Sequence, residues 1–166
     1  MTTLSQTIRW FVLFLLVTLS GWASAALAAE SKYQVQLVWG TDEPKAPALE
    51  MKELAPDIRE RLRQLRWKNY FVVKSESASV GSKEAKKVTL SEHCAVELKE
   101  LPSGHLEVRM HSIKAGGEVK QVANKTMSLK ELGEGKLIIY AGDSKDSWDD
   151  AWLVIVRAEQ PAPAKP

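Results

Sequence analysis

The 166-residue chain has little of what marks several classes of protein. Cys94 is its only cysteine, so an intrachain disulfide is excluded. Lys and Arg number 23 against 21 Asp and Glu, and this near balance argues against a nucleic-acid-binding surface. The chain also lacks an internal repeat, a glycine-rich phosphate loop, a nucleophile elbow and an HExxH zinc motif. We therefore expect one domain without a cofactor, and an enzyme is not favoured.

The first residues carry the pattern of an export signal. Arg9 precedes an apolar run at residues 10–19, and Ala26-Leu27-Ala28 fits a small-x-small cleavage site. We expect a signal peptide at residues 1–28, which implies a periplasmic or secreted protein with no stable membrane span once the peptide is cleaved. An uncleaved membrane tether is the alternative, because residues 10–29 hold no charge.

The remaining chain is expected to form one α+β domain at residues 29–158, followed by a disordered Pro/Ala tail at residues 159–166. Loss of Arg9 with the signal peptide lowers the formal net charge from +2 to +1. The mature chain is thus almost neutral. Its partner is expected to be a protein or an envelope component and not a nucleic acid.

Residues 56–73 indicate an amphipathic helix that runs into an apolar strand. Pro56 suits the first position of a helix, where its missing N–H costs nothing. Ile58, Leu62 and Leu65 recur at i, i+4 and i+7 and so share one face. Because a helix this short is marginal by itself, we expect its apolar face to be covered by a sheet.

Alternating or continuous apolar patterns predict the strands. They fall at residues 32–39, 70–73, 88–98, 106–110, 118–123, 136–140 and 151–157. Residues 75–87 are predicted as an exposed loop, the strand at 88–98 as bulged near Glu92, and the strand at 136–140 as central. We therefore predict an α+β fold with a curved, mostly antiparallel sheet of about six to seven strands. The sheet would be a meander or a partly open barrel, with one amphipathic helix packed on it.

One hairpin can be assigned a register from its charges. Residues 102–104 form a three-residue loop that ends in glycine, which is typical of a type I turn followed by a bulge. This loop places Lys99 opposite Glu107 and Glu97 opposite Arg109, so both cross-strand pairs are favourable. A register shifted by two residues would place Glu97 opposite Glu107, and two like charges would repel each other. We therefore predict the register that pairs Glu97 with Arg109.

His93, His111 and Cys94 are candidates for metal or redox chemistry. In the predicted register the two histidines are diagonal neighbours about 7 to 8 Å apart, and no HxH or CxxC spacing accompanies them. Solvent-facing histidines are therefore favoured over a metal site. Cys94 has the parity of the apolar positions around it, which favours a buried structural cysteine over a reactive thiol.

Arg59, Arg63 and Arg66 form a basic stripe beside the apolar face of the predicted helix. Such a stripe could bind a carboxylate, a phosphate or an anionic headgroup. The alternative is a solvated face balanced by Asp57 and Glu60, and the sequence favours it.

A polar loop between the last two strands holds Asp146, Trp148 and Asp149. Carboxylates in a loop suit calcium, but their spacing matches no calcium-binding loop. A tryptophan at a polar tip either folds back on the core or marks a contact surface. We take these three residues, together with an exposed sheet edge, as a candidate surface for a protein partner.

Four short segments carry a resemblance. Residues 37–42 (LVWGTD), 66–71 (RWKNYF), 141–143 (AGD) and 151–152 (AW) resemble segments of small exported bacterial proteins of uncharacterised function. The resemblance implies export but no activity and no site. The sequence thus favours an exported, non-enzymatic binding domain of the cell envelope. The alternatives are a metal-binding or sensing module that uses the histidine-bearing sheet face, and a hydrolase built from residues distant in sequence.

Overall fold

The computed structural model describes residues 30–46, 48, 50–81, 84–143 and 150–159, and within them nine strands and two helices are present. In chain order they are β1 Ser31–Thr41, β2 Lys52–Glu53, α2 Pro56–Leu62, β3 Asn69–Val80, β4 Lys86–Ser91, β5 Cys94–Leu101, β6 His105–Ile113, β7 Val119–Ser128, α3 Leu129–Gly133, β8 Ile138–Asp143 and β9 Ala151–Ala158.

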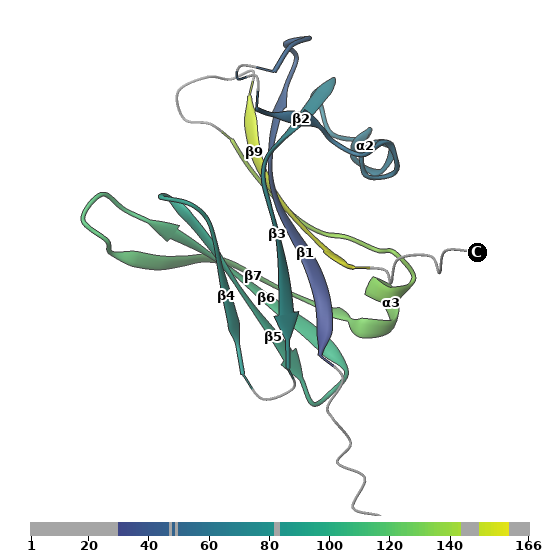
Figure 1. Ribbon diagram of the computed structural model, residues 1–166, viewed down its shortest axis with the longest axis vertical. Helices are drawn as coiled ribbons and strands as arrows, with labels where there is room; N and C mark the ends of the chain where they lie inside the picture. The colour runs from purple at the N-terminus through teal and green to yellow at the C-terminus, as the bar shows by residue number, and fades with distance from the viewer. Residues whose placement is uncertain (1–29, 47, 49, 82–83, 144–149, 160–166) are drawn as a thin grey trace, which may run out of the picture.

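The strands divide between two antiparallel sheets (Figure 1). Sheet A has the order β2-β3-β1-β9-β8, and sheet B has the order β4-β5-β6-β7. The predicted α+β class with antiparallel pairing is confirmed. The prediction of one sheet with six to seven strands and a single helix is wrong, because the described residues form nine strands in two sheets, not closed into a barrel, and a second helix.

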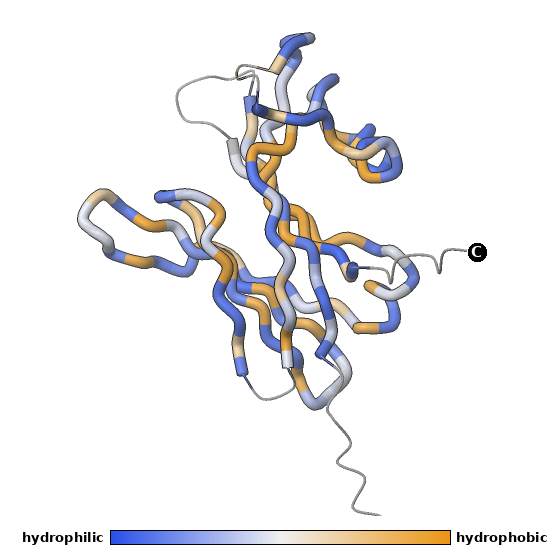
Figure 2. The backbone as a smooth tube through the Cα atoms, in the orientation of Figure 1, coloured by the Kyte–Doolittle hydropathy of each residue, from blue (hydrophilic) through white to orange (hydrophobic). Residues whose placement is uncertain are grey.

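Sheet A packs on sheet B with one face and on α2 with part of its opposite face. Val35 and Val156 of sheet A pack with Val96 and Val108 of sheet B in one hydrophobic core. A second core lies between the opposite face of sheet A and α2. Apolar segments therefore run through the middle of both sheets (Figure 2). This arrangement also buries Gln36, although it alternates with the apolar residues Val35 and Leu37 of β1.

The apolar face of α2 packs on sheet A as predicted. Ile58 and Leu62 are each 1% exposed and contact the core that contains Val38 and Leu153. Leu65 is half-buried against the same core, although α2 ends at Leu62. The helix is shorter than the spacing of its apolar residues indicated. The apolar face is buried all the same, because Leu65 packs on the core from the segment that follows the helix.

Helix α3 has only five residues, which is too short for periodicity to reveal. Its start nevertheless carries a local signal. Ser128 Oγ accepts a hydrogen bond from the backbone N–H of Glu131 at 3.2 Å and donates one to Glu131 Oε2 at 2.9 Å. This reciprocal capping box ends β7 and places Leu132 in the core between the sheets.

The β5–β6 hairpin has the predicted register, with Glu97 paired with Arg109 and Lys99 with Glu107. The prediction of a single strand at residues 88–98 is wrong. A two-residue turn at Glu92 divides it into β4 and β5. Because the pairing of β4 with β5 shifts beside this turn, even-numbered residues of β4 pair with even-numbered residues of β5. Apolar residues therefore occupy every second position from β4 through the turn into β5, and the sequence pattern does not reveal the turn.

Two further strands differ from the prediction. β3 continues to Val80 through a segment predicted as loop, because Ala78 and Val80 alternate with exposed serines and are both buried. β8 lies at the edge of sheet A, whereas its apolar run indicated a central strand. Ile138 and Tyr140 are buried all the same, because their side chains face sheet B. In the described part of the chain, no helix combines the length and apolar character needed to cross a bilayer.

Candidate functional site

The two sheets pack tightly at one end and diverge at the other, where the β4–β5 and β6–β7 turns project away from sheet A (Figure 1). A cleft of about 440 Å³ lies between the diverging sheets. Its lining from sheet A comprises Leu37, Val73, Gly142, Trp152 and Val154, and its lining from sheet B and the β4–β5 turn comprises Ser91, Glu92, His93, Cys94, Met110, His111, Ser112 and Val122.

The cleft forms because the same strands run from the closed end to the open end. On β9, Val156 and Val154 are buried between the sheets, whereas Trp152, two residues earlier on the same face, is 44% exposed. On β6, Val108 is buried and Met110 is only partly buried. Apolar side chains that would otherwise complete the core therefore line an open cavity.

A bulge in β7 adds an apolar residue to the mouth of the cleft. The pairing of β6 with β7 shifts between Met110 and His111, so that Val122 has no direct partner. Val122 is 48% exposed and lines the cleft from sheet B, while Trp152 lines it from sheet A. Exposed apolar residues on both sides of a concave site are typical of a ligand-binding mouth.

The cleft has little charge. Among its described lining residues, Glu92 is the only one with a formal charge when histidine is neutral. Burial raises the pKa of the Cys94 thiol and is the only cause of that shift, so no cation among the described residues activates the sulfur. Cys94 is only partly buried, and a thiol without an activating partner is poorly suited to nucleophilic catalysis. The lining is better suited to contact with apolar groups.

The two candidate histidines both border this cleft. His93 lies in the β4–β5 turn, where its backbone carbonyl accepts a hydrogen bond from Ile113 N at 2.9 Å, and His111 pairs with Ala95 as predicted. His111 Nε2 is buried and has no hydrogen-bond partner among the described residues. The described residues contain no group of three or more His, Cys, Asp or Glu side chains able to hold a metal ion. The metal hypothesis therefore gains no geometric support.

Each arginine of the stripe makes a local contact on its own side of the structure. Arg59 lies 3.9 Å from Glu53, Arg63 lies 2.7 Å from Glu60, and the Arg66 guanidinium lies 5.5 Å from the ring centroid of Trp67. These are exposed local contacts, which contribute little to stability. Their role as an anion-binding site stays a prediction.

A separate cavity of about 250 Å³ contains two other arginines, Arg61 and Arg157. Arg157 Nε donates to Gln34 Oε1 at 2.7 Å, and Asp57 and Glu159 also line this cavity. Two acids thus accompany two bases. This balance does not favour a free anion there.

Asp146, Trp148 and Asp149 lie outside the described residues, so their proposed contact with a partner stays a prediction. Their position in the chain is still informative. They belong to the connection between β8 and β9, and Gly142 and Trp152 on those two strands line the cleft.

The sequence missed the residues that make the cleft apolar. Met110, Val122 and Trp152 look like ordinary core positions of alternating strands. Only the divergence of the two sheets leaves them accessible. The bulge that frees Val122 has no signal in the sequence that distinguishes it from a regular strand.

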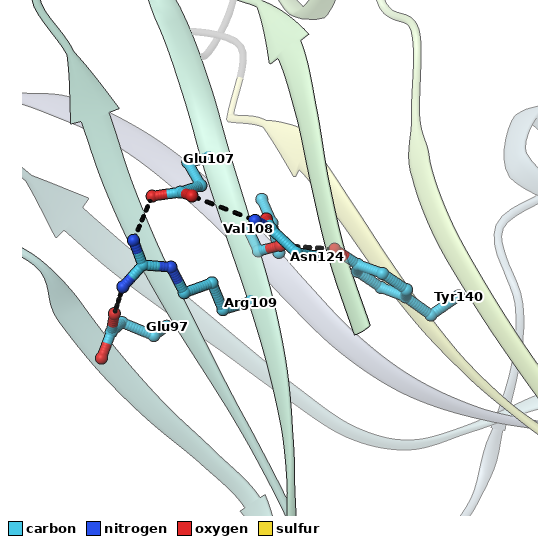
Figure 3. A network of polar contacts seen from close by, with 6 residues as sticks. All are labelled: Glu97, Glu107, Val108, Arg109, Asn124 and Tyr140. Carbon is cyan, nitrogen blue, oxygen red and sulfur yellow. Dashed lines mark hydrogen bonds and ion pairs between the residues drawn. The ribbon is translucent and has the colours of Figure 1, made fainter. Parts of the chain in front are cut away.

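The outward face of sheet B carries a polar network instead of a cavity (Figure 3). Arg109 lies between two carboxylates, with Nη1 3.1 Å from Glu97 Oε1 and Nη2 2.7 Å from Glu107 Oε2. Asn124 Nδ2 donates to the other oxygen of Glu107 at 3.1 Å. The polar groups satisfy one another, which makes this face a structural network.

Comparison with protein-family models, with curated proteins and with solved structures finds no match for this chain. The likeness to small exported bacterial proteins therefore stays a prediction. The candidate site depends on the geometry of the cleft alone.

Proposed function

We propose that this chain is an exported, non-enzymatic protein of the cell envelope that binds a small apolar molecule in the cleft between its two sheets. The observation that carries the proposal is the apolar cleft with Val122 and Trp152 exposed on opposite sides of its mouth. Its volume of about 440 Å³ lies within the range of about 300–1,000 Å³ that is typical of small-molecule sites.

The lining favours this function over the two alternatives. A hydrolase needs a nucleophile and a base within hydrogen-bonding reach, and the pKa shift of Cys94 has burial as its sole cause. A metal-binding module needs several ligands around one point, and the described residues offer no such group. Contact with apolar groups, by contrast, uses most of the residues that line the cleft.

A glycine in the cleft offers a clean test. A Cβ at Gly142 would meet no atom of the described residues within 4 Å, so Gly142→Trp places a large side chain at the cleft without a clash at its Cβ. Gly133 in α3 is equally open but does not line the cleft, which makes Gly133→Trp a matched control.

The measurement is binding of N-phenyl-1-naphthylamine, a neutral fluorescent probe, to the mature chain and to both variants. We expect Gly142→Trp to weaken binding at least about tenfold, which is about 1.4 kcal/mol, with Gly133→Trp unchanged. Thermal melting of all three proteins checks that they are folded. Equal binding by both variants, or no binding by the parent, contradicts the proposal.

A further inference from the structure

A row of aromatic residues crosses sheet A beside the cleft. Phe71 on β3 is paired with Trp39 on β1, and Trp39 is paired with Trp152 on β9. Directly paired residues of antiparallel strands project from the same face of a sheet, so the three rings share one face. The next strand of the sheet is β8, where Gly142 is paired with Trp152. The row therefore ends at a residue without a side chain.

The row lies on the face of sheet A that turns towards sheet B. Val154, two residues after Trp152 on β9, packs in the core between the sheets. Tyr140, two residues before Gly142 on β8, packs in the same core. Residues two apart on a strand project from the same face, and Trp152 and Gly142 accordingly both line the cleft. The end of the aromatic row is thus part of the candidate site.

The space above Gly142 is open. A Cβ at Gly142 would meet no atom of the described residues within 4 Å, so the indole of Trp152 does not lie over the glycine. Among the described residues, a ring-to-ring contact joins Trp39 to Phe71, and none joins Trp152 to another ring. Trp152 is also 44% exposed. A glycine within a strand is typical of a place where a ligand approaches the sheet closely.

The spacing of the strands suits an aromatic ring at this place. Neighbouring strands lie about 4.8 Å apart, so a flat ring above Gly142 would lie about that far from the indole of Trp152. Aromatic rings attract one another at centroid separations of about 4.5–7 Å. The contact between Trp39 and Phe71 in the same row, at 6.1 Å, falls within that range. A saturated ring above Gly142 would gain apolar contact but no stacking.

The wall of the cleft formed by sheet B is also suited to an aromatic ligand. Met110 and Val122 line the cleft from that side. The thioether sulfur of a methionine makes favourable contacts with aromatic rings, often at the ring edge. The described lining residues include no lysine or arginine, so a ligand without a negative charge fits best.

We propose that the ligand of the cleft is a neutral molecule with a flat aromatic ring, which lies above Gly142 and stacks on Trp152 as the fourth ring of the row. This inference rests on the proposed binding of a small apolar molecule in the cleft, and it narrows the class of that molecule. Trp152 then determines specificity, because it distinguishes a flat aromatic ring from an aliphatic group of similar size.

The test compares 2-naphthol with trans-decahydro-2-naphthol as competitors of N-phenyl-1-naphthylamine on the mature chain at pH 7. The two compounds have the same carbon skeleton and one hydroxyl, and only 2-naphthol is flat and aromatic. Because stacking adds to the gain from burial of apolar area, we expect 2-naphthol to displace the probe at about fivefold lower concentration. Recognition of apolar area alone gives no such preference, since the saturated compound buries at least as much apolar surface.

Two variants assign the preference to one ring. Trp152→Leu removes the ring and keeps an apolar side chain at the cleft, and we expect it to reduce the preference for 2-naphthol to within about twofold. Trp39→Leu is the matched control, because it makes the same substitution one strand further from Gly142, and the preference should remain about fivefold. Thermal melting checks that both variants are folded. The preference of the parent chain is a test that needs no variant.

The outcomes separate this inference from the proposed function. Failure of the parent chain to bind N-phenyl-1-naphthylamine overturns both. Equal displacement of the probe by the two compounds overturns only the aromatic ligand and leaves the apolar cleft as a binding site. Retention of the preference in folded Trp152→Leu, or an equal loss of it in both variants, likewise overturns stacking on Trp152.

Discussion

Tyr140 on β8 donates a hydrogen bond from its hydroxyl to the backbone carbonyl of Val108 on β6, and this bond joins sheet A to sheet B (Figure 3). Burial raises the pKa of the Tyr140 hydroxyl to about 12, so the phenol remains protonated and able to donate at neutral pH. Gly142 on the same strand lines the cleft two residues further on. The bond is therefore placed to fix the separation of the sheets beside the site.

We expect Tyr140→Phe to lower the free energy of unfolding by about 1–2 kcal/mol, because it removes a buried hydrogen bond. Binding of the neutral probe should also weaken, since the sheets lose a link beside the cleft. Tyr70→Phe is the matched control, because Tyr70 donates to the carbonyl of Leu62 at 3.2 Å beneath α2. Denaturant unfolding should show a similar loss for both variants, with probe binding weakened only in the first. Equal effects on binding would contradict the link to the cleft.

Because α2 packs on sheet A, we expect the free energy of unfolding to fall most for substitutions of its most buried side chains. Ile58→Ala and Leu62→Ala each create a cavity in a packed core and should cost about 2–5 kcal/mol. Leu65→Ala should cost less because that side chain is half-buried. Arg63→Ala, on the exposed face, should change the free energy of unfolding by no more than about 0.5 kcal/mol in urea titrations. A loss at Arg63 as large as that at Ile58 would disprove the proposed packing.

Cys94 reports on the cleft because it is the only cysteine and lines the cavity. Burial raises its pKa, so at pH 8 less thiolate is present than in the unfolded chain, and thiolate is the reactive form. Iodoacetamide should therefore alkylate the folded protein more slowly than the chain in urea, and the rate for the folded protein should level off at a higher pH than the rate for the unfolded chain. Saturating neutral probe should slow alkylation further. An unchanged rate with bound probe would place the probe elsewhere.

The charge of the cleft predicts selectivity among alkyl ligands. Among the described lining residues there is no lysine or arginine, and Glu92 is the one acid. A carboxylate held at the cleft would lose water without gaining a cation. We expect 1-decanol to displace the probe at least about tenfold better than decanoate, with decylamine nearer to the alcohol. Displacement by decanoate at the lowest concentration would contradict this prediction.

Local features of the fold could be predicted because their causes are local. The Glu97–Arg109 pairing depends on a three-residue loop and on the sign of neighbouring charges, and both are visible in the chain. The apolar face of α2 depends on spacing alone, and Ile58 and Leu62 are buried as that spacing requires.

The turn at Glu92 that separates β4 from β5 was not visible, because the bulge between Thr89 and Ser91 lets the alternation of apolar residues continue through it. The candidate site was hidden for a related reason. Val154 and Trp152 share one face of β9 and one apolar character, yet one is 3% exposed and the other 44%.

The sequence alone thus determined which residues face inward, because alternation and spacing are properties of each strand or helix by itself. Only the tertiary structure decided which inward-facing residues are covered. Coverage depends on the distance between two sheets, and that distance is set by contacts between strands far apart in the chain, such as the one between Tyr140 and Val108.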